Sequence, residues 1–224
     1  MMQRRTLLIT GGTGLVTPWV AWAALGEAEA ASGVREALAR GAEAALKNLG
    51  RTDGFLGNAK VRIPLPGHLA DAAKLMRRLG QGKRVDQLET AMNRAAEAAV
   101  PEARTLLVNT VKQISVEDAL RIVKGGDTAV TDFFARKTRT PLSETFLPIV
   151  TRATEKVDLA RKYNRVAGQG VGLGLVKPED ADVQQYVTRK ALDGLYLMIG
   201  EEEKKIRADP VGTGSAILKK VFGL

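Results

Sequence analysis

Cysteine is absent from the 224-residue sequence, and histidine occurs only once, at His68. The chain therefore has no disulfide, no thiolate metal site, no cysteine nucleophile and no lipoprotein anchor on an N-terminal cysteine. Any catalytic triad or multi-histidine metal site would have to be built around His68. Because His68 follows Pro66-Gly67 at an expected helix start, we interpret it as a first-turn or surface residue. We expect the protein to use neither a metal nor a cofactor.

Aromatic residues make up only 4% of the sequence, whereas 45% of the residues are hydrophobic. The core must therefore be built mainly from Ala, Leu and Val, and the chain has enough of them for one domain. The formal net charge is +9, which favours anionic partners. Nucleic acid is not the expected partner, because a recognisable nucleic-acid-binding module and aromatic residues that stack on bases are both missing. An anionic lipid, an envelope polymer or a protein partner fits the charge better.

The segment TGGTGLV at 10–16 resembles the glycine-rich turn of short-chain dehydrogenases and epimerases. In those enzymes the glycines let the backbone approach a pyrophosphate at a helix N-terminus. Here Thr17-Pro18 stands where the last glycine is required, and no acidic residue closes a second strand about 20 residues later. The rest of the sequence also lacks the alternating strands and helices of a parallel sheet. A dinucleotide-binding loop is therefore the weaker interpretation.

The same segment is better explained as part of an export signal. Arg4-Arg5 supplies a basic start of twin-arginine character, residues 6–26 carry no charge, and Ala28-Glu29-Ala30 forms a small-x-small cleavage site. The sequence predicts a cleaved signal peptide at 1–30 and a mature periplasmic domain at 31–224, without a transmembrane span in the mature form. A retained N-terminal anchor stays open as the alternative, because about 20 uncharged residues can cross a bilayer.

From Ser32 onward, the apolar spacing and the start and stop signals are typical of successive helices. We expect helices at about 32–49, 67–79 and 82–99, and further ones that begin at Pro101, Ser115, Asp127, Thr140-Pro141 and Asp182. The segment VRIPLP at 61–66 predicts an extended strap laid over helices, because two prolines remove backbone donors. The glycine-rich stretch 168–177 is expected to interrupt the helices. The fold class is all-α: a single-domain multi-helix bundle with one short extended Pro-containing strap.

The last predicted helix, from Asp182 to Arg207, carries a carboxylate among its apolar residues. One arc of this helix holds Val187, Ala191, Leu195, Met198, Ile199 and Ile206, and Glu202 falls in its middle. Glu202 must be paired, have a raised pKa, or lie where the arc reaches solvent. We expect surface pairs between Glu201 and Lys205 and between Glu203 and Arg207, and Asp193 beside Arg189 on the opposite arc. The alternative function is a hydrolase-like enzyme with a pocket around Glu202, to which Asp193 or His68 would contribute.

The densest basic patch of the sequence is formed by Lys74, Arg77, Arg78, Lys83 and Arg84. A solvated helix face explains this patch, and so does a surface that binds an anionic ligand or partner. Arg94 and Glu97 stand three residues apart on the side opposite Met92, and we interpret them first as a solvated pair. Arg94 is also a candidate contact to a ligand or partner.

Six ordered segments, VRIPLP, MNRAAE, FLPIV, YVTRKALDGLY, EEEKKIR and LKKVFG, together resemble the bacterial family known as domain of unknown function 4197. The resemblance covers about residues 33–224. It implies an exported, helical protein of the Gram-negative envelope, and it implies neither an activity nor catalytic residues. The leading hypothesis is a non-catalytic periplasmic protein that binds an anionic or amphipathic ligand or an envelope partner. A purely structural envelope role is a further alternative.

Overall fold

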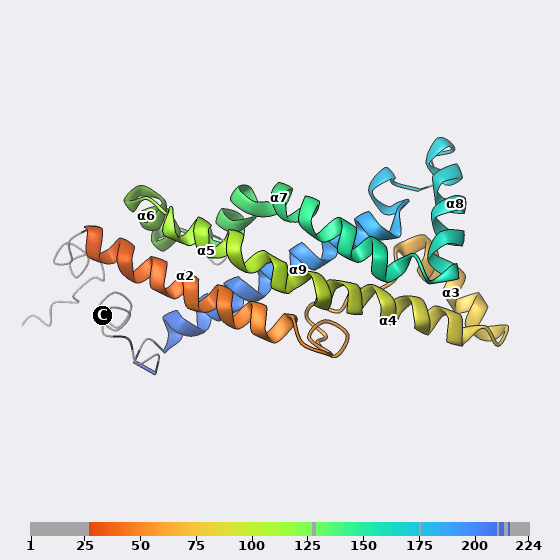
Figure 1. Ribbon diagram of the computed structural model, residues 1–224, viewed down its shortest axis with the longest axis horizontal. Helices are drawn as coiled ribbons and strands as arrows, with labels where there is room; N and C mark the ends of the chain where they lie inside the picture. The colour runs from red at the N-terminus through yellow and green to blue at the C-terminus, as the bar shows by residue number, and fades with distance from the viewer. Residues whose placement is uncertain (1–26, 127–128, 175, 210, 213–214, 216–224) are drawn as a thin grey trace, which may run out of the picture.

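Helix α9 (Val183–Ala208) runs along the middle of the molecule and contacts three other long helices. These are α2 (Glu27–Leu49), α4 (Gly82–Ala99) and α7 (Ala129–Thr154), which lie around α9 in Figure 1. Val187, Leu195 and Tyr196 of α9 are all fully buried. At 3.6 residues per turn these three positions span about half of the helix circumference. Helix α9 is therefore the centre of the hydrophobic core.

The computed structural model describes residues 27–126, 129–174, 176–209, 211–212 and 215. Within these residues every regular element is a helix, which confirms the all-α prediction. The other elements are α3 (Gly67–Arg78), the 3-10 helix η1 (Val100–Ala103), α5 (Arg104–Lys112), α6 (Val116–Lys124), α8 (Asp158–Gly172) and the 3-10 helix η2 (Pro178–Asp180). Outside the described residues lie the predicted Asp127 start, the LKKVFG segment and the predicted signal peptide, except for positions 27–30, which belong to α2.

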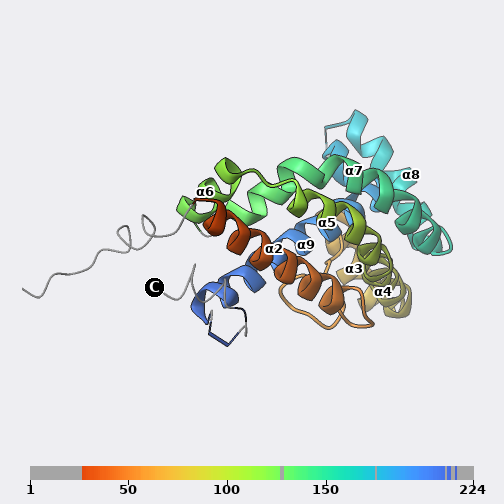
Figure 2. The ribbon, with the colours of Figure 1, turned by 60° about the vertical axis from the view of Figure 1, so that its left-hand side comes forward.

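The shorter helices divide between the two ends of an elongated molecule. Helix α6 packs against α2 and α7 near one end, and the start of α2 lies there too. Helix α3 packs against α4 at the other end, where α8 contacts α4 and α9. The turned view in Figure 2 shows the same division. The α3–α4 turn and α8 therefore lie together, far along the molecule from the start of α2.

Helix α7 contradicts the prediction that a new helix begins at Thr140-Pro141. It is continuous from Ala129 to Thr154 and contains Pro141 and Pro148. Both prolines are on the exposed side, where water can bind the carbonyls that lose an N–H donor. The buried side is an unbroken stripe with four-residue spacing, formed by Phe134, Thr138, Leu142, Phe146, Val150 and Thr154. Burial of this stripe stabilises the helix more than the two prolines destabilise it.

Helix α8 shows that the predicted break at 168–177 was too long. The helix runs from Asp158 to Gly172 and so includes the first five residues of that stretch. Ala160, Tyr163 and Ala167 are buried at helical spacing, which explains why this segment stays helical in spite of its glycines. The helix ends just before Gly174, whose φ of 69° lies in the left-handed region that favours glycine.

Candidate functional site

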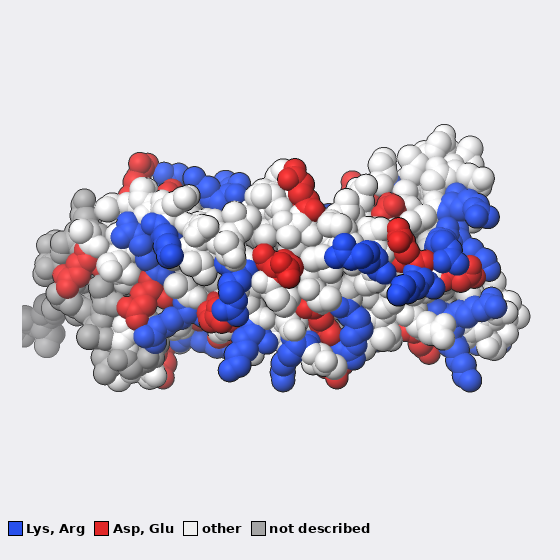
Figure 3. All heavy atoms as spheres, viewed as in Figure 1, with Lys and Arg blue, Asp and Glu red and all other residues white. Residues whose placement is uncertain are grey.

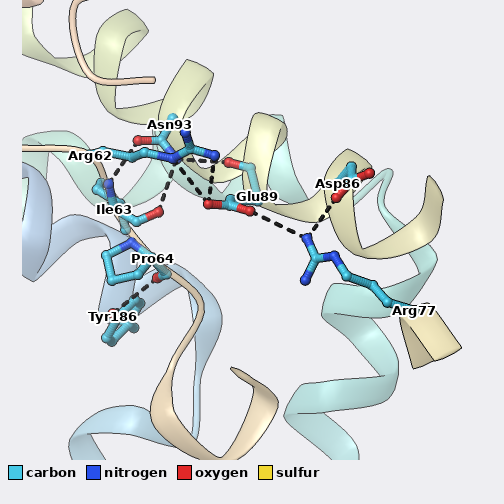
Figure 4. Close-up of polar contacts among 8 residues, drawn as sticks. All are labelled: Arg62, Ile63, Pro64, Arg77, Asp86, Glu89, Asn93 and Tyr186. Carbon is cyan, nitrogen blue, oxygen red and sulfur yellow. Dashed lines mark hydrogen bonds and ion pairs between the residues drawn. The ribbon is translucent and has the colours of Figure 1, made fainter. Parts of the chain in front are cut away.

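Two cations of the predicted basic patch are neutralised by neighbouring carboxylates. Lys74 forms an ion pair with Asp71 of the same helix at 2.9 Å. Arg77 Nη2 lies 2.7 Å from Asp86 Oδ1, across the α3–α4 turn (Figure 4). These pairs are exposed, so they contribute little to stability, but they leave the two cations with less charge to offer a ligand.

The other three cations of the patch, Arg78, Lys83 and Arg84, are exposed, and none has an ion-pair partner among the described residues. The charge of Arg84 also affects Asp158, the first residue of α8. There the pKa of Asp158 is lowered by the hydrogen bond from Lys162 and, more weakly, by the charge of Arg84. Arg84 therefore lies near the base of α8, where Asp158 also pairs with Arg161 and Lys162.

Two leucines lie exposed among these cations. Leu75 is 58% exposed and Leu79 is 70% exposed, whereas most large apolar side chains of the chain are buried. Figure 3 shows Lys and Arg side chains next to uncharged surface at this end of the molecule. We call the surface formed by Leu75, Arg78, Leu79, Lys83 and Arg84 the basic end. Its chemistry suits a partner that is both anionic and apolar.

Arg94 and Glu97 form a structural anchor and not the predicted solvated pair. Glu97 is only 5% exposed, and its Oε1 accepts the backbone N–H groups of Phe55 and Leu56 at 3.0 and 3.1 Å. Arg94 donates to Glu97 Oε2 at 2.6 Å and to Asp53 Oδ1 at 2.8 Å, and these hydrogen bonds raise the pKa of Arg94. The pair fastens the loop that follows α2 to helix α4, which explains Arg94 without a ligand.

The strap at 61–66 is extended, as predicted, and it lies across α4 and α9. Val61, Ile63 and Leu65 are buried and alternate with the exposed residues Arg62 and Pro64, and Pro66 at the end of the strap is buried as well. Asn93 Oδ1 accepts the Ile63 N–H at 2.8 Å, and Asn93 Nδ2 donates to the Ile63 carbonyl at 3.0 Å (Figure 4). Tyr186 donates its hydroxyl to the Pro64 carbonyl at 3.1 Å. Because burial raises the pKa of Tyr186 to about 12, this hydroxyl remains a donor throughout the neutral pH range.

The most deeply placed glutamate of α9 is Glu203 and not Glu202. The side chain of Glu203 is 6% exposed, against 14% for Glu202. Glu203 pairs with Arg207, as predicted, but within the packed part of the helix and not on the surface. Glu202 pairs with Lys205 at 2.7 Å. The carboxylate on the apolar arc therefore has a structural partner of opposite charge.

Two other predicted pairs on α9 are replaced by contacts to distant parts of the chain. Glu201 binds Lys60 at 2.6 Å and not its predicted partner on α9, and the hydrogen bond from Lys60 lowers the pKa of Glu201. Asp193 binds Arg139 of α7 at 2.8 Å, whereas Arg189, its predicted partner, pairs elsewhere. Nine residues of helix, about 13 Å of rise, separate Asp193 from Glu202. The structure does not bring these two candidate catalytic residues together.

Residues 24–223 match the model of a family described as protein of unknown function, DUF4197. The chain belongs to this family. No curated protein and no solved structure matches it. The description of DUF4197 names no reaction and no ligand.

The DUF4197 chain has a polar cleft between α7, α8 and α9, with a volume of about 710 Å³. Asn164 donates to Gln184 Oε1 at 2.7 Å and accepts the backbone N–H of Val183 at 2.9 Å. Gln184 in turn donates to Thr154 Oγ1 at 3.0 Å. The polar groups of these side chains form hydrogen bonds that join α8 to α7 and α9. Neither Glu202 nor Asp193 lines this cleft.

The remaining candidates add no site to the DUF4197 chain. His68 is the second residue of α3, and its side chain lies outside the described part of the structure. Among the described residues, no three His, Asp or Glu side chains are grouped so that they could hold a metal ion. Within the same ranges, no helix combines the length and the apolar character that a membrane crossing requires.

The apolar half of the basic end was missed by sequence reasoning, although a signal was present. Leu75 and Leu79 stand four residues apart, so they share one side of the helix. Leu69 and Ala73 form the side of α3 that is buried. A pair of leucines out of phase with the buried side, within a basic segment, is the pattern that predicts an exposed apolar contact.

Proposed function

We propose that this DUF4197 chain is a non-catalytic protein of the bacterial envelope that binds an anionic membrane surface through its basic end. The observation that carries the proposal is the placement of Arg78, Lys83 and Arg84, which have no ion-pair partner in the described part of the chain, beside two exposed leucines. The net charge of +9 adds long-range attraction to the same kind of surface. No comparable observation favours a hydrolase, because Glu202 and Asp193 each end in a separate ion pair.

The strength of such binding follows from the number of groups. A Lys or Arg close to an anionic leaflet contributes about 1 kcal/mol, and this attraction falls off within a Debye length, about 10 Å at 0.1 M salt. Partial burial of Leu75 and Leu79 adds a hydrophobic contribution of similar order. The proposed contact is therefore reversible and salt-dependent, unlike permanent anchoring by a membrane-spanning helix.

A periplasmic location is part of the proposal and is supported by the Arg4-Arg5 start, the uncharged residues 6–26 and the Ala28-Glu29-Ala30 site. We expect N-terminal sequencing of the exported protein to begin near Ala31. Ala31 is fully buried in α2, so cleavage before it leaves that core contact within the mature chain. An intact Met1 on the exported protein would contradict cleavage and favour the retained anchor.

Binding is tested by co-sedimentation of the exported protein with vesicles. We expect it to sediment with vesicles that contain phosphatidylglycerol at low salt, to be released at high salt, and to stay in solution with pure phosphatidylcholine. The triple variant Arg78→Gln, Lys83→Gln and Arg84→Gln should lower the partition coefficient about a hundredfold, since three contributions of about 1 kcal/mol are lost.

A matched control separates the basic end from net charge alone. Lys124, Arg136 and Lys137 are also exposed and lack ion-pair partners among the described residues, but they lie on α6 and the first half of α7. Replacing these three by Gln removes the same charge and should lower binding far less. Equal losses in the two triple variants would refute the assignment to the basic end. Absence of sedimentation with anionic vesicles at low salt would refute membrane binding altogether.

A further inference from the structure

We infer that helix α8 inserts its exposed apolar side into the interfacial region of the anionic bilayer that the basic end contacts. This inference rests on the proposed function and assigns a second, deeper contact to it. Helix α8 lies across the same end of the molecule as the α3–α4 turn, as Figure 1 shows. It meets α4 there, and Arg84 acts electrostatically on Asp158 at its base.

One side of helix α8 is buried against the rest of the protein, and the other side is exposed to solvent. Ala160, Tyr163 and Ala167 are buried, and the Tyr163 hydroxyl donates to the Asp180 carbonyl at 2.6 Å, which holds the helix against the following segment. The outer side carries Lys162, Val166, Gln169 and Leu173, at spacings that place them in one row. Val166 is 67% exposed and Leu173 is 74% exposed. They are among the most exposed large apolar residues in the described part of the chain.

The charges of α8 are ordered along the helix. Its first half carries Asp158, which pairs with Arg161 and Lys162, and the further cation Arg165. Residues 166–174 contain no charged residue. No acidic residue occurs between Asp158 and Glu179. Arg165 is exposed and has no ion-pair partner among the described residues. A helix segment with cations at one end and an exposed, uncharged apolar stretch at the other matches the boundary between anionic head groups and acyl chains.

Charge complementarity favours a lipid surface over a protein groove as the occupant. Within the described ranges Arg78, Lys83 and Arg84 have no ion-pair partner, and Arg165 adds a fourth such cation at the same end of the molecule. Cations that are spread over several elements suit the surface of an anionic bilayer, because lipid head groups offer negative charge across the whole plane of that surface. Val166 and Leu173 can then contact the acyl chains just below the head groups. This depth is within the range of interfacial helices, whose apolar side is buried about 5–10 Å into the boundary between head groups and acyl chains.

The absence of cysteine gives a direct test on the whole exported protein, because a single introduced cysteine is its only thiol. Leu173→Cys and Val166→Cys are labelled with an environment-sensitive fluorophore, and Val108→Cys on α5, where the native valine is 37% exposed, serves as the control position. With phosphatidylglycerol vesicles we expect a blue shift at positions 166 and 173, and quenching there by a lipid spin-labelled near the head group. The label at position 108 should show neither effect.

The outcomes distinguish this inference from the proposed function. If the protein sediments with the vesicles but the label at position 173 stays in water, insertion of α8 is refuted and binding by the basic end stands. If the label shifts with protein concentration in the absence of vesicles, the apolar side of α8 binds a second copy of the chain, and insertion is again refuted. Independently, Leu173→Asn should lower the vesicle partition coefficient by roughly threefold to tenfold. An unchanged coefficient would contradict the inference.

Discussion

The Glu97→Ala variant is expected to lose about 4 kcal/mol of unfolding free energy. The native carboxylate is buried and accepts the N–H groups of Phe55 and Leu56 as well as the guanidinium of Arg94. The substitution leaves two backbone donors and a cation without this partner, and each unsatisfied buried donor costs about 1–3 kcal/mol. For a domain of this size the melting temperature should fall by about 10 °C. Urea unfolding followed by circular dichroism measures the loss.

Two further variants control this result. Glu97→Gln keeps a carbonyl oxygen for the two amides but removes the charge beside Arg94, so we expect about half of the loss. Glu102→Ala removes an exposed glutamate nearby in the sequence and should change stability by no more than about 0.5 kcal/mol. If Glu97→Ala is no more destabilising than Glu102→Ala, the loop after α2 does not depend on this anchor.

The Gly54→Ala variant should destabilise the same loop by about 3 kcal/mol or more. A Cβ atom at position 54 would lie 2.3 Å from the Leu49 carbonyl oxygen and 2.6 Å from that of Asn48. Both are backbone atoms at the C-terminal end of α2, so a side-chain rotation cannot relieve the overlap. Thermal unfolding of the variant beside the native protein measures the effect.

Gly168→Ala is the matched control for this substitution. Gly168 lies in α8, and a Cβ atom there would meet nothing within 4 Å. Because alanine is the better helix former, we expect this variant to be as stable as the native protein or more stable by up to about 1 kcal/mol. A Gly54→Ala protein that melts at the native temperature would show that the loop can move away from α2.

The elements that sequence reasoning predicted correctly are those specified by local signals. Asp182 starts α9 by accepting the Gln185 N–H at 2.8 Å, and Ser115 starts α6 by accepting the Asp118 N–H at 3.0 Å. Both caps depend only on residues within one helical turn. The strap follows from Pro64 and its neighbours, because proline withholds backbone donors wherever it stands.

The errors arise where contacts between distant segments outweigh local preference. A proline is a sound local reason to begin a helix at Thr140-Pro141, but the buried stripe of α7 extends through Pro141 and keeps one helix. Glu97 looked like a surface residue because its backbone partners, Phe55 and Leu56, are about 40 residues away in sequence. Spacing along one helix does not reveal what the neighbouring loop requires.

The sequence predicts which basic residues form the candidate site, but it does not predict which of them form ion pairs. The sequence locates the basic segment, because Arg78, Lys83 and Arg84 stand close together. It does not show that Asp86 neutralises Arg77 while these three cations find no ion-pair partner among the described residues, since that depends on how α3 folds back on α4. The leucines became informative only once the buried side of α3 was known.

The position of the first residues of α2 restricts how the molecule can be oriented in a cell. Helix α2 begins near α6, whereas α8 and the α3–α4 turn lie at the far end (Figures 1 and 2). If a chain is held at a bilayer directly at the start of α2, Arg78, Lys83 and Arg84 lie at the end of the molecule that is far from the tether, where a facing bilayer can be reached. A chain released by cleavage could tumble and approach the leaflet it came from. Signal processing would then decide whether the protein bridges two membranes or coats one.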